Sequence, residues 1–146
     1  MIVTVDTNIL FQALYSNVGA SHEVLKMIRR GDVVLAISVP VFQEYRDVLS
    51  RIETRSILGM DEDDIQTIMQ FVALVGRPTE ISFTWRPNLQ DEGDNMMVEL
   101  ARASGSTYLI TRNTRDFVQN SDLKNDDLRI VTPAEFLKEW RETHGE

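Results

Sequence analysis

Residues 1–10 read MIVTVDTNIL, a run of β-branched residues that ends at a carboxylate. The composition of residues 2–5, IVTV, predicts a strand, and the polar residues Asp6, Thr7 and Asn8 end it. Apolar side chains then recur through residues 9–14, ILFQAL, as they do in a helix. The stretch therefore predicts a strand that leads directly into a helix. Asp6 can either cap that helix or serve as a functional carboxylate at the strand end, and the residue pattern leaves both interpretations open.

The same alternation of strands and helices continues along the chain. Apolar runs typical of buried strands occur at 33–38, 107–111 and 129–131, with a shorter candidate at 81–83. Amphipathic patterns predict helices at 21–31 with Ser21 as cap and Gly31 as stop, at 40–50 from Pro40, at 61–75 with a capping acidic first turn, at 94–105, and from Pro133 with Thr132 as cap. Segments 86–93 and 120–128 are expected to be loops.

This order of elements predicts the class of fold. Strands that alternate with helices of about ten or more residues form βαβ units, which build a parallel sheet covered by helices. A chain of 146 residues is long enough to bury one core. We therefore expect a single domain over residues 1–146, a three-layer α/β/α sandwich with a central, mainly parallel sheet.

Composition narrows the class of protein. The chain has no cysteine, which excludes disulfide scaffolds, thiol catalysis and thiolate zinc sites. Its apolar segments are short and no signal peptide is evident, so no membrane association is expected and the cytoplasm is the expected location. The net charge of −8, from 15 basic and 23 acidic residues, argues against nucleic-acid binding through the overall electrostatic field.

Four carboxylates are expected near the carboxyl edge of the predicted sheet. Asp6 ends the first strand, Glu44 lies one turn into the helix after 33–38, Asp94 begins the helix before 107–111, and Asp116 follows that strand. Ligands of parallel α/β sheets bind at this edge. Like charges gathered there repel unless a cation joins them, and Mg²⁺ or Mn²⁺ prefers oxygen ligands. The implied chemistry is metal-assisted phosphoryl transfer, which requires no histidine base.

Each of these acids also has a plainer interpretation. Asp6 and Asp94 can be helix caps, Glu44 can be an exposed charge on an amphipathic helix, and Asp116 can close a turn. Two polar residues strengthen the functional interpretation, because Thr111 ends a predicted strand and Asn113 follows it. A hydroxyl and an amide at this position can orient carboxylates or water molecules bound to a metal.

Four segments in this chain resemble the PIN-domain family, and in particular the VapC-like toxin ribonucleases of toxin–antitoxin modules. They are VDTNIL, VFQEYRDVL, DEGDNMMVELA and YLITRNTRDF, which occur in the order and spacing of that family. The resemblance extends from Ile2 to about residue 136. It implies an α/β/α fold, Mg²⁺- or Mn²⁺-dependent endoribonuclease activity on RNA, a homodimer and a neutralising antitoxin protein.

The resemblance also implies roles for individual residues. The catalytic, metal-binding acids would be Asp6, Glu44, Asp94 and Asp116. Asn8, Thr111 and Asn113 match the polar positions that support them. Arg112, Arg115 and Arg46 are candidates for RNA contact that would offset the acidic net charge.

Two departures from the family pattern bear on substrate choice. Asp91, Glu92, Gly93 and Asp94 stand where many relatives have Asp-Pro-Asp-Asp, which puts a direct role for Asp91 in doubt. Arg112 stands where a glycine is frequent, and it can either contact a phosphate or narrow the cleft.

Two other functions are alternatives to the nuclease. One is a PIN-like module that binds RNA or protein with little or no nuclease activity; four mutually repelling carboxylates argue against a purely structural site. The other is a haloacid-dehalogenase-like phosphatase with Asp6 as nucleophile. That chemistry needs an aspartate two residues later, where this chain has Asn8.

Overall fold

The computed structural model of the chain describes residues 1–81, 92–118 and 127–144, with every side chain in these ranges except those of Glu92, Asp116 and Val118. The elements in chain order are β1 (Ile2–Val5), α1 (Thr7–Tyr15), α2 (Ala20–Arg30), β2 (Val34–Ile37), α3 (Val39–Leu49), α4 (Ile52–Leu58), α5 (Glu62–Val75), β3 (Arg77–Pro78), α6 (Glu92–Ser104), β4 (Tyr108–Ile110), α7 (Thr114–Val118), β5 (Arg129–Val131) and α8 (Pro133–His144).

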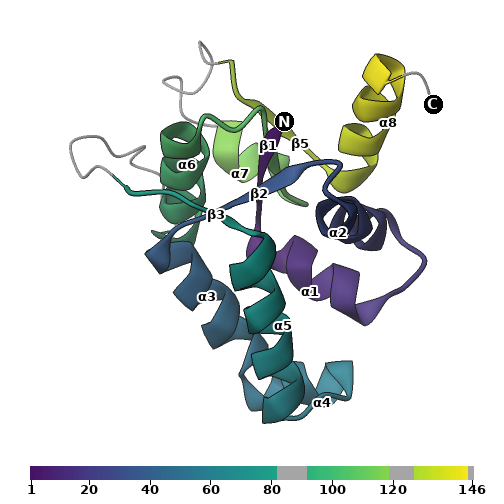
Figure 1. The fold of residues 1–146 in the computed structure, drawn as a ribbon, viewed down its shortest axis with the longest axis vertical. Coiled ribbons are helices and arrows are strands. Elements are labelled where there is room, and N and C mark those ends of the chain that lie inside the picture. The colour runs from purple at the N-terminus through teal and green to yellow at the C-terminus, as the bar shows by residue number, and fades with distance from the viewer. Residues whose placement is uncertain (82–91, 119–126, 145–146) are drawn as a thin grey trace.

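The strands form one five-stranded sheet in the order β3-β2-β1-β4-β5. Every strand pair in this sheet is parallel, and β1 is central, with Val3 opposite Leu35 on one side and Tyr108 on the other. Figure 1 shows α6 on one side of the sheet and α2 and α8 on the opposite side. The predicted α/β/α architecture is therefore confirmed.

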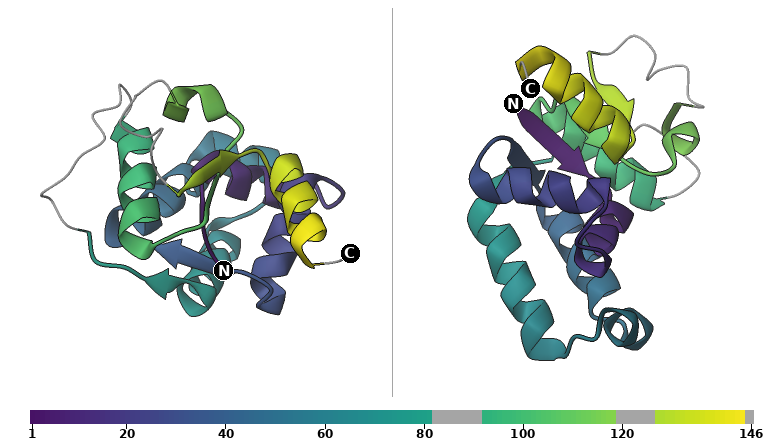
Figure 2. Two further views of the ribbon diagram at one scale, coloured as in Figure 1. Left: turned by 90° about the horizontal axis from the view of Figure 1, so that it is seen from above. Right: turned by 90° about the vertical axis from the view of Figure 1, so that its right-hand side faces the viewer.

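The core lies between the sheet and its helices. Val3, Ala36, Leu109 and Ile110 are completely buried, as expected for strands covered on both faces. The helices α3, α4 and α5 extend together beyond the sheet, at the bottom of Figure 1 and again in Figure 2. Within this extension α4 has no fully buried residue, and its Leu58 packs against the core while only partly buried.

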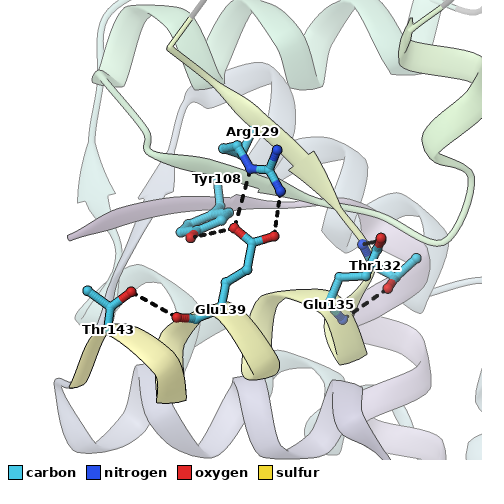
Figure 3. Close-up of polar contacts among 6 residues, drawn as sticks. All are labelled: Tyr108, Arg129, Thr132, Glu135, Glu139 and Thr143. Carbon is cyan, nitrogen blue, oxygen red and sulfur yellow. Dashed lines mark hydrogen bonds and ion pairs between the residues drawn. The ribbon is translucent and has the colours of Figure 1, made fainter. Parts of the chain in front are cut away.

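Several predicted helix ends are confirmed. Gly31 and Gly105 follow α2 and α6 with φ of +84° and +69°, the left-handed conformation that glycine adopts without a steric penalty. Asp61 caps α5 in a reciprocal capping box with Asp64. Thr132 and Glu135 cap α8 in the same way, each side chain accepting the other residue's backbone N–H, as Figure 3 shows.

Other local predictions were wrong. Ser21 does not cap α2; Gly19 occupies that position, and Ser21 is buried inside the helix. The strand beside β2 was not predicted: it is β3 at Arg77–Pro78, and the adjacent Thr79 donates its backbone N–H to the Ile37 carbonyl at 2.8 Å. Ile81 lies outside any strand, and residues 82–83 lie outside the described residues, as do most of the predicted loops at 86–93 and 120–128.

The C-terminal helix is attached to the sheet by a polar cluster at β4 and β5. The Glu139 carboxylate accepts hydrogen bonds from the Tyr108 hydroxyl at 3.1 Å and from the Arg129 guanidinium at 2.5 Å and 3.3 Å (Figure 3). The Tyr108 ring also packs edge-on against Phe136 of α8. These contacts join α8 to two neighbouring strands.

No helix within the described residues is long and apolar enough to cross a membrane.

Candidate active site

Asp6 lies between β1 and α1, and it makes two kinds of contact, one as the cap of the helix and one with a residue at the end of a neighbouring strand. Its backbone is extended, with φ −63° and ψ 148°, and it is the N-cap residue of α1. Its Oδ1 accepts the Thr7 backbone N–H at 2.8 Å, and its Oδ2 accepts the Thr111 hydroxyl at 2.8 Å. The half-buried carboxylate is therefore fixed from two sides, by the start of α1 and by the end of β4.

Thr111 connects the ends of three adjacent strands. Its side chain is completely buried; the hydroxyl donates to Asp6 and accepts the Asn113 backbone N–H at 3.2 Å. The main chain continues this network, because Asp6 N–H donates to Ile110 O and Thr111 N–H donates to Val131 O, both at 2.9 Å. These hydrogen bonds hold the carboxyl ends of β1, β4 and β5 side by side at the same edge of the sheet.

The contact between Asp6 and Thr111 lies at the topological switch point of the sheet. The chain passes from β1 to β2 and β3 on one side, while β4 and β5 lie on the other side of β1. In open parallel α/β sheets this reversal of strand order creates the crevice in which ligands bind. A negatively charged side chain with fixed orientation at that position is a strong indication of a binding site.

The other predicted acids come from helices around this edge. Glu44 is half-buried on α3, which packs against α1 and α6. Asp94 is half-buried in the first turn of α6, which begins two residues earlier than predicted, so Asp94 does not cap it. Asp116 lies within α7, a helix that the sequence did not predict, and its side chain is outside the described set, as is Asp91.

The acidic side chains at this edge are candidate ligands for a divalent cation. No group of three or more His, Asp or Glu side chains close enough to hold a metal occurs among the described side chains, which do not include that of Asp116. Asp6 itself fits a hard cation, because its carboxylate supplies oxygen donors and two hydrogen bonds hold it in one orientation. Oxygen donors are those that Mg²⁺ and Mn²⁺ prefer.

The remaining predicted residues lie on the surface. Asn8 is exposed in the first turn of α1, and Asn113 is exposed beyond β4, where its backbone supports Thr111. The three arginines proposed for RNA contact, Arg46, Arg112 and Arg115, are all exposed. These positions suit contact with a ligand, and the roles assigned to them remain predictions.

Sequence reasoning treated Tyr45 as a core residue only. Its side chain is 1% exposed, and its hydroxyl donates a hydrogen bond to the carbonyl of Val5, the residue before Asp6. Burial raises the pKa of this hydroxyl, and the nearby Asp6 carboxylate raises the pKa further, so the phenol remains neutral. A tyrosine on an otherwise aliphatic buried stripe was the available signal, because a buried phenol needs a partner.

Comparison with known proteins identifies the family. Residues 2–115 match the model of the PIN domain family, and the chain belongs to that family. The match includes Asp6, Glu44 and Asp94 and ends one residue before Asp116. None of the curated proteins matches the chain.

A solved structure supports the same fold. The crystal structure of VapBC2 from Rickettsia felis, bound to a DNA fragment from their promoter, contains a chain similar to this one with a TM-score of 0.62. The two are 17% identical, and the alignment covers 89% of this chain and 97% of that chain. The α/β/α arrangement is therefore shared over nearly the whole length of both chains.

Proposed function

We propose that this protein is a metal-dependent endoribonuclease that hydrolyses RNA phosphodiester bonds, and that it is the toxin component of a toxin–antitoxin module. The observation that carries the proposal is the Asp6 carboxylate, oriented by Thr7 and Thr111 at the switch point of the sheet. PIN-family membership supports it, and three of the four proposed acids, Asp6, Glu44 and Asp94, lie within the matched residues 2–115.

In this proposal Asp6, Glu44, Asp94 and Asp116 hold Mg²⁺ or Mn²⁺. The bound cation would supply positive charge that stabilises the negative charge developing on the phosphodiester during hydrolysis. Thr111 and the Thr7 N–H keep the Asp6 carboxylate in one orientation. Because these donors are a buried side chain and a helix backbone, the carboxylate needs little rearrangement when the cation binds.

Two of the proposed RNA contacts, Arg112 and Arg115, follow β4 in sequence, so both can approach phosphates of a strand bound near Asp6. Arg46 is on α3, the helix that carries Glu44, and it lines a groove with Gln66 and Ala73 of α5. Guanidinium groups suit this task because they bind phosphate with two parallel hydrogen bonds. The positive charge of these arginines would locally offset the repulsion between RNA and a chain of net charge −8.

The proposed partners are an antitoxin protein and a second copy of the chain. The solved structure that this chain resembles is a VapBC2 complex on promoter DNA, which supports the antitoxin partner. Size measurement of the purified protein, alone and co-expressed with the product of a neighbouring small gene, tests both partners. A monomer that captures no such product would contradict this part of the proposal.

The activity is tested by RNA cleavage with Mn²⁺, with and without EDTA, for the wild type and for Asp6→Asn and Asp94→Asn. EDTA and either substitution should abolish cleavage. Asp63→Asn is the matched control, because this aspartate is exposed at the start of α5. Full cleavage by both site variants would overturn the assignment.

A second candidate function is a PIN-like module that binds RNA or protein with little or no nuclease activity. It is favoured by one observation, that no three acidic side chains gather closely among those described. RNA binding that persists in EDTA, together with no cleavage in Mn²⁺ at any concentration, would identify this function.

A further inference from the structure

The Tyr45 hydroxyl closes a gap in the hydrogen bonding of the central strand. The register of β1 with β2 pairs Ile2 with Val34 and Val3 with Leu35, so Val5 lies beyond the last pair. On the other side, Asp6 N–H is bonded to β4. Buried carbonyls need a donor, and Tyr45 of α3 provides it at Val5. The contact spans 40 residues of sequence, and it lies one residue from the candidate carboxylate.

This bond differs in kind from the rest of the α3 packing. The buried residues of α3 are Val41, Tyr45 and Leu49, a stripe with four-residue spacing. Aliphatic contacts are non-directional, so they permit small rotations of a helix at little cost. A hydrogen bond to one carbonyl is directional and sets both the rotation and the height of α3 against the end of β1.

Glu44 is carried by the same turn of α3. Successive residues of a helix are about 100° apart, so any rotation that displaces Tyr45 also displaces Glu44 relative to Asp6. The two acids come from different elements, and both α1 and α6 contact α3. Within the described residues, the Tyr45 bond is the side-chain hydrogen bond that joins α3 to β1.

We infer that Tyr45 is a positioning residue, which fixes the spacing between Asp6 and Glu44 by bonding α3 to the end of β1. The inference rests on the proposed metal-dependent function and extends it by one residue that touches neither metal nor RNA. Outer partners that orient metal ligands typically contribute about 10–100-fold to metal affinity or activity.

Tyr45→Phe tests the inference, because it removes one oxygen atom and keeps the buried ring. Tyr108→Phe is the matched control: it also removes one phenolic hydrogen bond, to Glu139, at the attachment of α8. The main measurement is the dissociation constant for Mn²⁺ by calorimetry, with the melting temperature of the metal-free protein beside it. We expect both variants to melt lower, and only Tyr45→Phe to bind Mn²⁺ about tenfold more weakly.

A double-mutant cycle separates positioning from a purely structural role. In a Glu44→Gln background, Tyr45→Phe should weaken Mn²⁺ binding no further, because Tyr45 acts through Glu44. Unchanged Mn²⁺ affinity in Tyr45→Phe, equal losses in both tyrosine variants, or a Tyr45→Phe chain that does not fold would each overturn the inference. Failure of the proposed function is seen separately, as a wild type that neither binds Mn²⁺ nor cleaves RNA.

Discussion

Replacing Thr111 with valine removes the hydroxyl that holds Asp6 while keeping the shape of a completely buried side chain. The hydroxyl donates to a carboxylate at 2.8 Å, and hydrogen bonds to charged groups contribute about 1.5–3 kcal/mol. The Asn113 N–H loses its acceptor as well, but Asn113 is exposed and water can replace it. We therefore expect Thr111→Val to lower the free energy of unfolding by about 2 kcal/mol.

Urea denaturation of the metal-free protein measures this loss, and thermal melting gives a second value. A loss of about 2 kcal/mol corresponds to a melting temperature about 4–8 °C lower in a chain of this size. Thr111→Ser is the control, since it keeps the hydroxyl and deletes one buried methyl group, which costs about 1 kcal/mol. If Thr111→Val is as stable as Thr111→Ser or more stable, the hydroxyl does not hold Asp6 in the way described.

Two further predictions concern the attachment of α8 and the end of α5. Glu139→Gln should lower stability by about 1 kcal/mol, since Arg129 is largely exposed and its charge is screened. The Arg129 hydrogen bond holds the pKa of Glu139 below its ordinary value of 4.5, so this stabilisation is present above pH 4.5 and is lost as the pH falls through the lowered pKa. The melting temperatures of the two proteins should therefore converge at a pH below that lowered pKa. Gly76→Ala should cost about 1–3 kcal/mol by urea denaturation, because the added Cβ would lie 2.7 Å from Ile37 Cδ1 and 2.8 Å from the Val72 carbonyl oxygen. Wild-type stability in Gly76→Ala would show that α5 can shift freely.

The central part of the fold could be predicted because its signals are local and agree with one another. Residues 2–5 combine β-branched composition with a polar stop, and Gly31 and Gly105 end their helices with a conformation that glycine favours. Asp6 was placed at the carboxyl edge from sequence order alone, since parallel strands bring their ends together.

The missed features depend on contacts that a local pattern does not contain. Nothing in IETRSIL separates α4, which fully buries no residue, from a surface loop. Ser21 has a typical capping sequence, but the tertiary structure buries it and starts α2 one residue earlier. The partner of the Tyr45 hydroxyl is 40 residues away, so a single sequence cannot name it. The four candidate acids were placed near the carboxyl edge from their order relative to the predicted strands, and the family resemblance then implied their role as metal ligands.

The two-residue strand β3 determines how the sheet can meet other molecules. The backbone N–H of Thr79 points to β2. Backbone groups alternate in direction along a strand, so the neighbouring position, Pro78, faces away from β2, and proline has no N–H to offer there. An additional strand that pairs with β3 would find no donor at Pro78, which disfavours backbone pairing of this strand with copies of the sheet. Association along β3 is therefore expected to use side chains, which give it a specificity that backbone pairing lacks.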